Sequence, residues 1–258
     1  MPILISRPWA GIALVTISNP GCRNALGPDD FQGLASTWNQ LALDDSLRCV
    51  VITGDGQTAF CAGARLGADF HAVPDIDDLV DRALLKTRVF PRPIVAAVNG
   101  HCVAGGFELM LASDIRVASA DAKFGLPEVR WGIVPSGGAA MKLVEQIGHA
   151  RAMRLLLTAE LIGADEAHSF GIVNEVVAAG DVLARALHFA RLIASNSPLA
   201  VFHTKQLALG GRADGWRERE PAERRSAALV RRSGDAFVGK RAFFAKVDPD
   251  YSQTGEDL

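Results

Sequence analysis

The chain has 258 residues, of which 49% are hydrophobic and 22% are charged, and its formal net charge is −2. This composition is that of an ordinary globular protein, long enough for one large domain or a core with a smaller appendage. A net charge close to zero gives no support to a nucleic-acid-binding protein. No uncharged apolar run reaches the roughly 18 residues of a membrane span. No secretory signal is evident at the N-terminus. From the net charge we expect no nucleic-acid partner, and from the lack of a long apolar run we expect no membrane partner.

The four cysteines, Cys22, Cys49, Cys61 and Cys102, show no C-x-x-C spacing. We therefore expect free thiols in a reducing compartment, and a cytoplasmic protein. The histidines form neither an H-x-x-x-H motif nor a cluster with cysteines, so we expect no metal site.

Strand and helix signals alternate through the first 90 residues. Short β-rich runs separated by Pro8 and Gly11 predict a starting hairpin, and Pro28 opens an amphipathic helix. The run CVVIT is apolar throughout and is typical of a buried strand. The elements predicted here are a hairpin with strands at 3–5 and 12–17, a helix over 28–43, a strand over 49–53 and a helix over 78–89.

The segment from Gly54 to Ala59 matches the G-x-G-x-x-A pattern of dinucleotide-binding proteins. That site requires an amphipathic helix directly after the glycines. A second small-residue turn follows instead, and Pro74 interrupts the continuation. We therefore interpret this segment as a turn at the end of a strand.

The stretch from Phe90 to Gly138 carries the strongest chemical signal. An apolar strand is predicted over 94–98, Ala104-Gly105-Gly106 forms a tight turn, and apolar residues at helical spacing predict a helix over 107–115. Free N–H groups at such a helix start can stabilise an oxygen that gains negative charge. Cys61-Ala62-Gly63-Ala64 is a similar turn. Two such turns facing one point would form an oxyanion hole.

Each of these signals also has a structural interpretation. Small residues allow close packing whatever their function, and an acid such as Glu108 in a first helical turn is favoured by the helix dipole. Glu128, after Pro127, is typical of a solvated turn, and His101 of a packing or lining residue. Ser136 lacks the G-x-S-x-G context of a serine hydrolase. Spacing alone leaves these alternatives open.

Strand signals end near residue 177, and the rest of the chain is helical. We place a boundary near Ser195, between an α/β core over 1–195 and a helical region over 196–258. These last helices are too few to bury their own apolar faces, so we expect them to pack on the core or on another subunit. The predicted elements are strands at 115–117, 123–124 and 173–177, helices at 137–147, within 158–167, at 181–194, 199–209, 218–232 and 235–246, and a polar loop at 210–215.

Several motifs occur together in an order and spacing that resemble the enoyl-CoA hydratase/isomerase (crotonase) family over nearly the full length. The motifs are RNAL (23–26), FCAGARL (60–66), PRPIVAAVNGHCVAGGFELMLASDIRVA (91–118), AKFGLPEVRWGIVPSGG (122–138), LTAELIGADEAHSFGIVNEVV (157–177) and AFFAK (242–246).

This resemblance implies a fold and a ligand. The fold would be an α/β spiral of repeated ββα turns with a C-terminal helical trimerisation region, in homotrimers or dimers of trimers. The ligand would be an acyl-CoA thioester. No cofactor is implied, because coenzyme A is part of the substrate.

The resemblance also implies a set of site residues. The backbone N–H groups of Ala64 and Gly105 would form the oxyanion hole, and Glu108 and Glu128 would be the acid/base pair. Phe243 and Lys246 match positions that reach the coenzyme A of a neighbouring subunit in relatives. The implied substrate- and CoA-binding residues are Arg23, Ala25, Ala62, Arg65, Leu66, Pro127, Phe243 and Lys246.

Retention of both carboxylates favours an enoyl-CoA hydratase, with Glu108 activating water and Glu128 delivering a proton. An isomerase or dehydratase acting on an unusual acyl group, and an acyl-CoA-binding protein without turnover, are the alternatives. The chain departs from the family pattern at Arg65, where Asp is usual, and at Ala104, where Gly is usual. The cation at Arg65 leaves the acyl specificity open.

Overall fold

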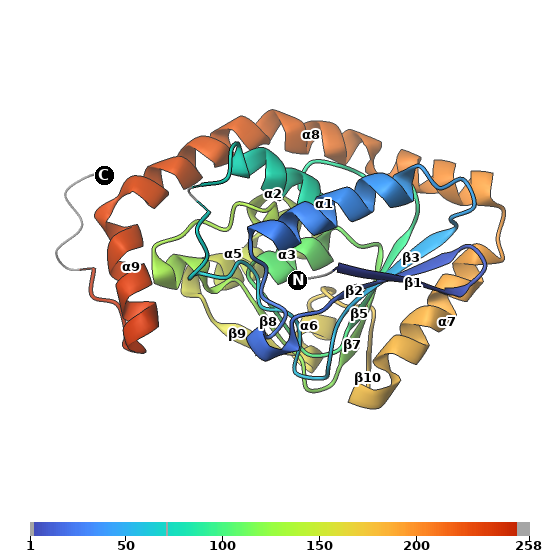
Figure 1. Cartoon of the computed structure of the whole chain (residues 1–258), viewed down its shortest axis with the longest axis horizontal. Helices are drawn as coiled ribbons and strands as arrows, with labels where there is room; N and C mark the ends of the chain where they lie inside the picture. The colour runs from blue at the N-terminus through green and yellow to red at the C-terminus, as the bar shows by residue number, and fades with distance from the viewer. Residues whose placement is uncertain (1–2, 71, 252–258) are drawn as a thin grey trace.

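The computed structural model describes residues 3–70 and 72–251 and is a mixed α/β protein built around two sheets (Figure 1). Most neighbouring strands are parallel; β1 with β2 and β8 with β9 are the antiparallel pairs. The larger sheet has the order β1 (Ile3–Trp9), β2 (Ile12–Ile17), β3 (Cys49–Gly54), β5 (Ile94–Val98), β7 (Ile115–Ser119) and β10 (Glu175–Val177). The smaller sheet has the order β4 (Ala59–Cys61), β6 (His101–Val103), β8 (Lys123–Gly125) and β9 (Leu161–Gly163).

The chain passes repeatedly from the larger sheet to the smaller one and then into a helical segment. β3 and β4 precede α2 (Ile76–Leu84), and β5 and β6 precede α3 (Gly105–Leu111). β7 and β8 precede the 3₁₀ helix η2 (Pro127–Trp131) and α4 (Ala139–Ile147). These successive passes are the ββα turns that the family resemblance implied. Because β4, β6 and β8 are neighbours in one sheet, the three turns that follow them lie side by side.

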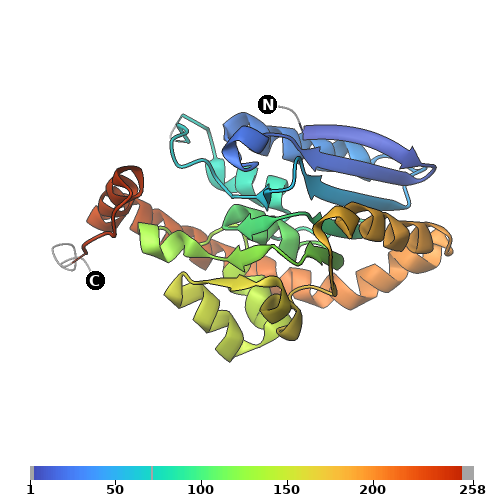
Figure 2. The same ribbon diagram turned by 90° about the horizontal axis from the view of Figure 1, so that it is seen from below.

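The middle strands of the larger sheet are covered on both faces, which explains their uninterrupted apolar sequences. On one face, α7 (Val182–Ala194) packs over the sheet through Val182, Ala186 and Ala190, which join a cluster with Val51 and Val95. The other face belongs to the main core, beneath α1 (Pro28–Ala42), α3 and α4. Figure 2 shows the first strands and α7 from below.

Three predicted helix boundaries in the core were wrong because tertiary contacts stop or delay the helices. The helix predicted to reach Ile115 ends at Leu111, where the Ser113 hydroxyl donates to the Met110 carbonyl oxygen at 2.6 Å. Asp114 then accepts from the Ile94 amide at 2.7 Å, so the chain enters β7. α2 ends well before residue 89, because Leu85 is left-handed, and α4 begins two residues later than predicted. The helix α5 (His149–Thr158) was not predicted, whereas α6 (Ala164–Ser169) partly overlaps the short helix predicted within 158–167.

The predicted loop at 210–215 was also wrong, because α8 (Pro198–Arg232) runs unbroken through it for 35 residues. Its glycines disfavour a helix locally. However, Ala213 and Trp216 are buried against Met141, and the Trp216 indole donates to Glu145 at 2.9 Å. Tertiary packing therefore overrides local propensity.

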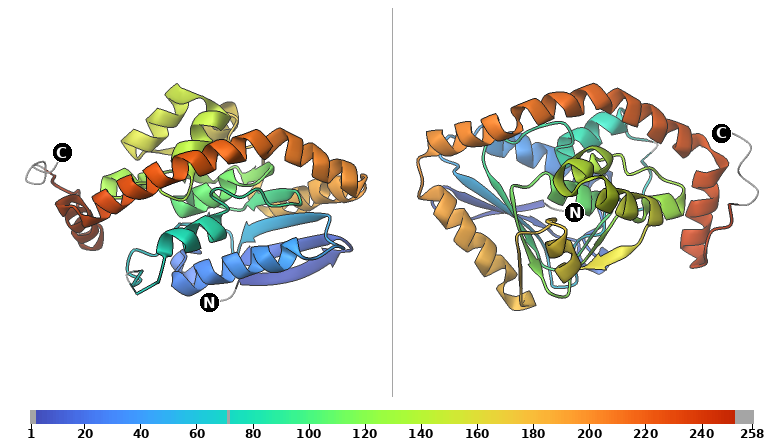
Figure 3. Two further views of the ribbon diagram at one scale, coloured as in Figure 1. Left: turned by 90° about the horizontal axis from the view of Figure 1, so that it is seen from above. Right: turned by 180° about the vertical axis from the view of Figure 1, so that it is seen from behind.

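α8 crosses the whole molecule in the view from above, and α9 (Gly234–Ala245) leaves its far end at a steep angle (Figure 3). The predicted boundary near residue 195 stays a prediction, and residues 252–258 of the predicted helical region lie outside the described part. Among the described residues, no helix is both long and apolar enough to cross a membrane.

Ala104 lies between β6 and α3 with φ 52° and ψ −133°, a conformation that L residues rarely adopt. We predict that Ala104→Gly stabilises the fold by about 1 kcal/mol, because the relieved backbone strain exceeds the extra chain entropy of glycine in the unfolded state. The measurement is the midpoint of denaturant unfolding.

The matched control is Ala112→Gly, at the end of α3, where φ is −83° and ψ is −7°. That backbone is favourable for alanine, so glycine should lower the midpoint. Two substitutions that shift the midpoint in the same direction would contradict the assignment of strain to Ala104.

Candidate active site

Two small-residue turns lie against each other at the ends of β4 and β6. A Cβ atom built on Gly63 would be 2.7 Å from the amide nitrogen of Gly105, so only glycine allows this approach. Gly63 also has a φ of +80°, which favours glycine. A Cβ built on Gly106 would lie 2.2 Å from the Cys61 carbonyl oxygen. The glycines therefore permit the backbones of the two turns to touch.

The first turn is held by the segment that precedes α1. The Leu26 amide donates to the Gly63 carbonyl oxygen and the Arg65 amide donates to the Leu26 carbonyl oxygen, each at 2.8 Å. The amide N–H groups of Ala64 and Gly105 have no acceptor among the described residues. These two groups are available to an oxygen atom of a ligand.

Asn24 fixes the neighbouring loop from inside. Its buried side chain donates to the carbonyl oxygens of Ala59 at 2.7 Å and Asp55 at 3.0 Å, and accepts from the Asn19 amide at 2.9 Å. These bonds attach the loop to the start of β4 and to the turn that precedes it. The loop thereby brings Arg23 and Ala25 to the wall of the cavity described below.

Glu108 lies in the first turn of α3 and is only 4% exposed. One carboxylate oxygen accepts from the amides of Gly137 at 2.7 Å and Ala139 at 3.1 Å. A Cβ on Gly137 would collide with the other oxygen of Glu108, so a larger residue there would displace this carboxyl group. Burial raises the pKa of Glu108 to about 7, although the two amide donors favour its charged form.

Glu128 is brought to the same place by η2. β8 pairs with β6, and the Ala104 amide donates to the Gly125 carbonyl oxygen at 3.0 Å, so η2 begins next to the start of α3. Glu128 is 8% exposed, and its Oε2 atom has no hydrogen-bond partner among the described residues. Burial, and then the nearby charge of Glu108, raise the pKa of Glu128 well above its ordinary value.

Both carboxyl groups and both free amides line one cavity of about 570 Å³. Eleven of the twelve site residues implied by the sequence also line it; the exception is Lys246, which forms the left-handed end of α9. Phe243 lines the cavity of its own chain, because α9 packs on η2. The Phe243 ring meets the Trp131 ring edge-to-face, with 5.2 Å between the ring centroids. Sequence reasoning missed the apolar wall, which includes Phe31, Val80, Leu84, Trp131 and Phe244.

Arg23 and Arg65 are the exposed cations of this cavity. The Arg65 guanidinium packs over Gly27, where an added Cβ would lie 2.8 Å from one of its nitrogens. Both cations lie beside the turns that carry the free amides. They are therefore placed to meet negative charge on a ligand that enters the cavity.

A larger cavity of about 900 Å³ lies between α8 and the core. Its lining includes Arg88, Asp114, Lys142 and Trp216 and none of the site residues implied by the sequence. The predicted site is thus not the largest cavity, but it is the one with two buried carboxyl groups and two free amides.

Comparisons with known proteins identify the family of the chain. A family model described as enoyl-CoA hydratase/isomerase matches residues 8–253. The enoyl-CoA hydratase EchA19 of Mycobacterium tuberculosis is 37% identical over 246 residues, which cover 92% of each chain. The 2,3-dehydroadipyl-CoA hydratase of Escherichia coli is 32% identical over 251 residues, which cover 96% of this chain and 98% of the relative.

Solved structures match equally well. A carnitinyl-CoA dehydratase from Mycobacterium avium is 37% identical and superposes with a TM-score of 0.89, covering 98% of this chain and 100% of that one. EchA1_1 from Mycobacterium paratuberculosis is 36% identical, also with a TM-score of 0.89, covering 96% and 97%. These matches confirm the crotonase-like fold that the motifs implied. The chain therefore belongs to the enoyl-CoA hydratase/isomerase family and is an enzyme of that family.

Proposed function

We propose that this enzyme is an enoyl-CoA hydratase, which adds water reversibly to a 2-enoyl-CoA thioester and gives a 3-hydroxyacyl-CoA. The observation that carries the proposal is the pair of buried carboxyl groups, Glu108 and Glu128, in one cavity with two free backbone amides. Relatives named as hydratases support the reaction class. Coenzyme A enters as part of the substrate, and the chemistry requires no metal or organic cofactor.

The amides of Ala64 and Gly105 are proposed to receive the thioester oxygen. When water adds to the β-carbon, negative charge moves to this oxygen, and two fixed N–H donors stabilise it without reorganising. Such donors bind the charged transition state more strongly than the neutral thioester, which is the condition for faster chemistry.

The proposed roles of the carboxyl groups follow from their ionisation. Glu128 is buried beside Glu108 and its Oε2 atom has no hydrogen-bond partner among the described residues, which favours its protonated form; we assign it as the acid that protonates the α-carbon. Glu108, with a pKa of about 7 and two amide donors to its carboxylate, is the base that takes a proton from the attacking water. At the end of addition the proton has moved from Glu128 to the substrate and one water proton to Glu108. Exchange of that proton back to Glu128 restores the starting state.

A dehydratase is a second candidate, because hydration is reversible and a similar solved structure is described as a carnitinyl-CoA dehydratase. The same residues would act in the opposite direction. Supplying a series of enoyl-CoA and 3-hydroxyacyl-CoA thioesters of different chain lengths, and following the absorbance of the conjugated double bond, separates the preferred substrates and tests the proposal directly.

We also propose that the chain assembles into trimers or dimers of trimers and is cytoplasmic. Free cysteines, three of them buried, suit a reducing compartment. Leu207, Phe237 and Phe244 on α8 and α9 are 85%, 67% and 56% exposed, which is a large apolar surface for a single chain.

The first prediction from this proposed function concerns the carboxyl groups. Glu108→Gln and Glu128→Gln should each slow hydration by at least about 100-fold, because each removes one partner of the proton transfers. Glutamine keeps the shape, so the affinity for coenzyme A should survive. The two losses should not be additive, because both groups serve one transition state. Hydration at the parental rate by Glu128→Gln would instead favour a one-carboxylate isomerase.

A second prediction concerns Arg65. We expect Arg65→Ala to raise KM for acyl-CoA substrates while kcat changes little, since an entrance cation holds the ground state and the transition state alike. Arg217→Ala is the control, because it removes an exposed cation of α8 that pairs with Asp214 and does not line the cavity. A large fall in kcat at unchanged KM would place Arg65 in the chemistry.

The third prediction concerns assembly. We expect a trimer or hexamer by light scattering, and we expect Phe237→Glu to weaken it, because the charge would have to be buried in an apolar contact. Lys240→Glu on the same helix tests whether charge alone has this effect. A stable, active monomer of the parental chain would refute the proposed assembly.

A further inference from the structure

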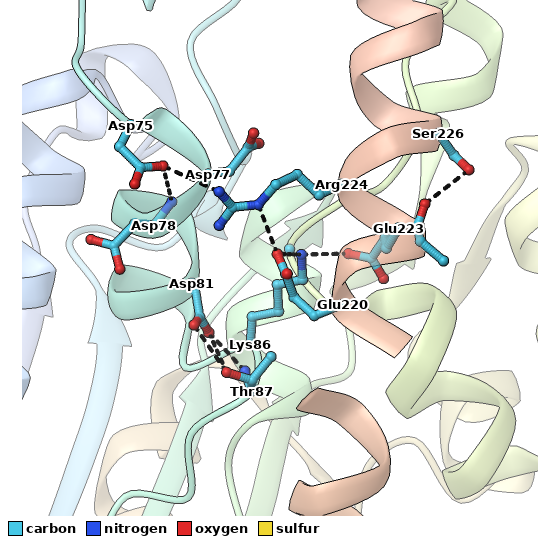
Figure 4. A network of polar contacts seen from close by, with 12 residues as sticks. Asp75, Asp77, Asp78, Asp81, Lys86, Thr87, Glu220, Glu223, Arg224 and Ser226 are labelled. Carbon is cyan, nitrogen blue, oxygen red and sulfur yellow. Dashed lines mark hydrogen bonds and ion pairs between the residues drawn. The ribbon is translucent and has the colours of Figure 1, made fainter. Parts of the chain in front are cut away.

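A cluster of buried charges interacts with Glu108 but does not line the cavity. Figure 4 shows its part between α2 and α8. The cluster contains Lys86, which follows α2, Lys142 on α4, and Glu220 and Glu223 on α8. The side chains of Lys86 and Glu223 are only 3% and 7% exposed. Burying such charges is costly unless they are paired. The proposed reaction does not use any of them directly.

The cluster joins α8 to the core. The Lys86 ammonium lies 3.2 Å from a carboxylate oxygen of Glu220 and 3.0 Å from one of Glu223. Figure 4 shows both carboxylates turned from α8 towards this ammonium. Arg224 extends the contact towards solvent, with Glu220 at 3.2 Å and Asp75 at 3.4 Å.

The same lysine touches the segment that holds Glu108. Gly137 and Ala139 donate their amides to Glu108, and Gly138 between them packs on Lys86, with 3.4 Å from a built Cβ to Cγ. The Lys142 amide donates to the Gly138 carbonyl oxygen at 2.9 Å. Its ammonium donates to the Leu85 carbonyl oxygen at 2.6 Å. The Lys142 side chain thus connects α4 to Leu85, the residue before Lys86, next to the segment that holds Glu108.

We propose that Lys86 is a positioning residue, held by Glu220 and Glu223 of α8, that braces residues 137–139 and sets the charge near Glu108. The helix α8 thereby takes part in preparing the proposed base from within the same chain. For its kinetic consequence, the inference rests on the hydratase function proposed above.

The direction of each effect can be worked out. After burial, the negative charge of Glu223 raises the pKa of Glu108 and the positive charge of Lys86 lowers it. Burial lowers the pKa of Lys142 to about 7, so its charge is partial near neutral pH. A base must be ionised, so a higher pKa moves the acidic limb of the rate profile to higher pH. The charged groups facing Glu108, directly or through Lys142, are Asp81, Lys86, Arg116, Glu128, Lys142 and Glu223.

The test is a pH titration of the full chain, without substrate, by infrared spectroscopy of the protonated carboxyl band that Glu108→Gln removes. We expect Lys86→Met to raise the midpoint and Glu223→Gln to lower it, each by at least about 0.5 pH unit. The double variant should return towards the parental midpoint. The control is Arg231→Met, which breaks an α8–α2 ion pair with Asp77 on the solvent side and should leave the midpoint unchanged.

Parental midpoints in Lys86→Met and Glu223→Gln, with only a loss of stability, would show a purely structural role and overturn the proposal. If Lys86→Met does not fold, Glu223→Gln alone tests the proposal. A Glu108 titration midpoint that is not lowered in Glu223→Gln would contradict it. The acidic limb of kcat/KM for enoyl-CoA hydration should move with the infrared midpoints. Opposite infrared shifts without hydration of any thioester would retain this network and reject the hydratase function.

Discussion

The parallel pairing of three very short strands, β4, β6 and β8, is the constraint on which the site depends. Strands of three residues bury little apolar surface by themselves. Their positions therefore depend on packing against the larger sheet and the helices that cover it. Their common direction places three turns at one edge. One turn carries Ala64, the next Gly105 and Glu108, and the last Glu128. The register of the strands fixes the distances between the three turns, so their positions do not depend on the conformation of a flexible loop.

That arrangement forces two carboxyl groups into a place with little water. Burial raises the pKa of both Glu108 and Glu128, and the nearby charge of Glu108 raises the pKa of Glu128 further. A fold that only needed stability would not keep this pair. The buried lysines near Glu108 offset part of the cost, and α8 supplies the carboxylates that hold Lys86 in turn. Charge interactions through Lys86 therefore link the candidate active site to α8.

Local sequence signals were reliable where local physics decides. The apolar runs gave β3 and β5 nearly to the residue, since a fully buried parallel strand has no polar face. The starting hairpin and α1 were also confirmed. The prediction was wrong for 107–115, where contacts of Ser113 and Asp114 end α3 early, and for 210–215, where packing of Ala213 and Trp216 keeps α8 helical despite three glycines.

The motifs of the sequence were enough to identify the family, and the family resemblance implied the ββα order of the core and eleven of the residues that line the cavity, because motifs are local properties of the chain. Only the tertiary structure decided the ionisation of Glu108 and Glu128, the approach of Phe243 to its own chain's cavity, and the pairing of Lys86 with Glu220, 134 residues away. Burial, dielectric environment and charge pairing depend on what the whole fold brings together. No spacing along the chain encodes them.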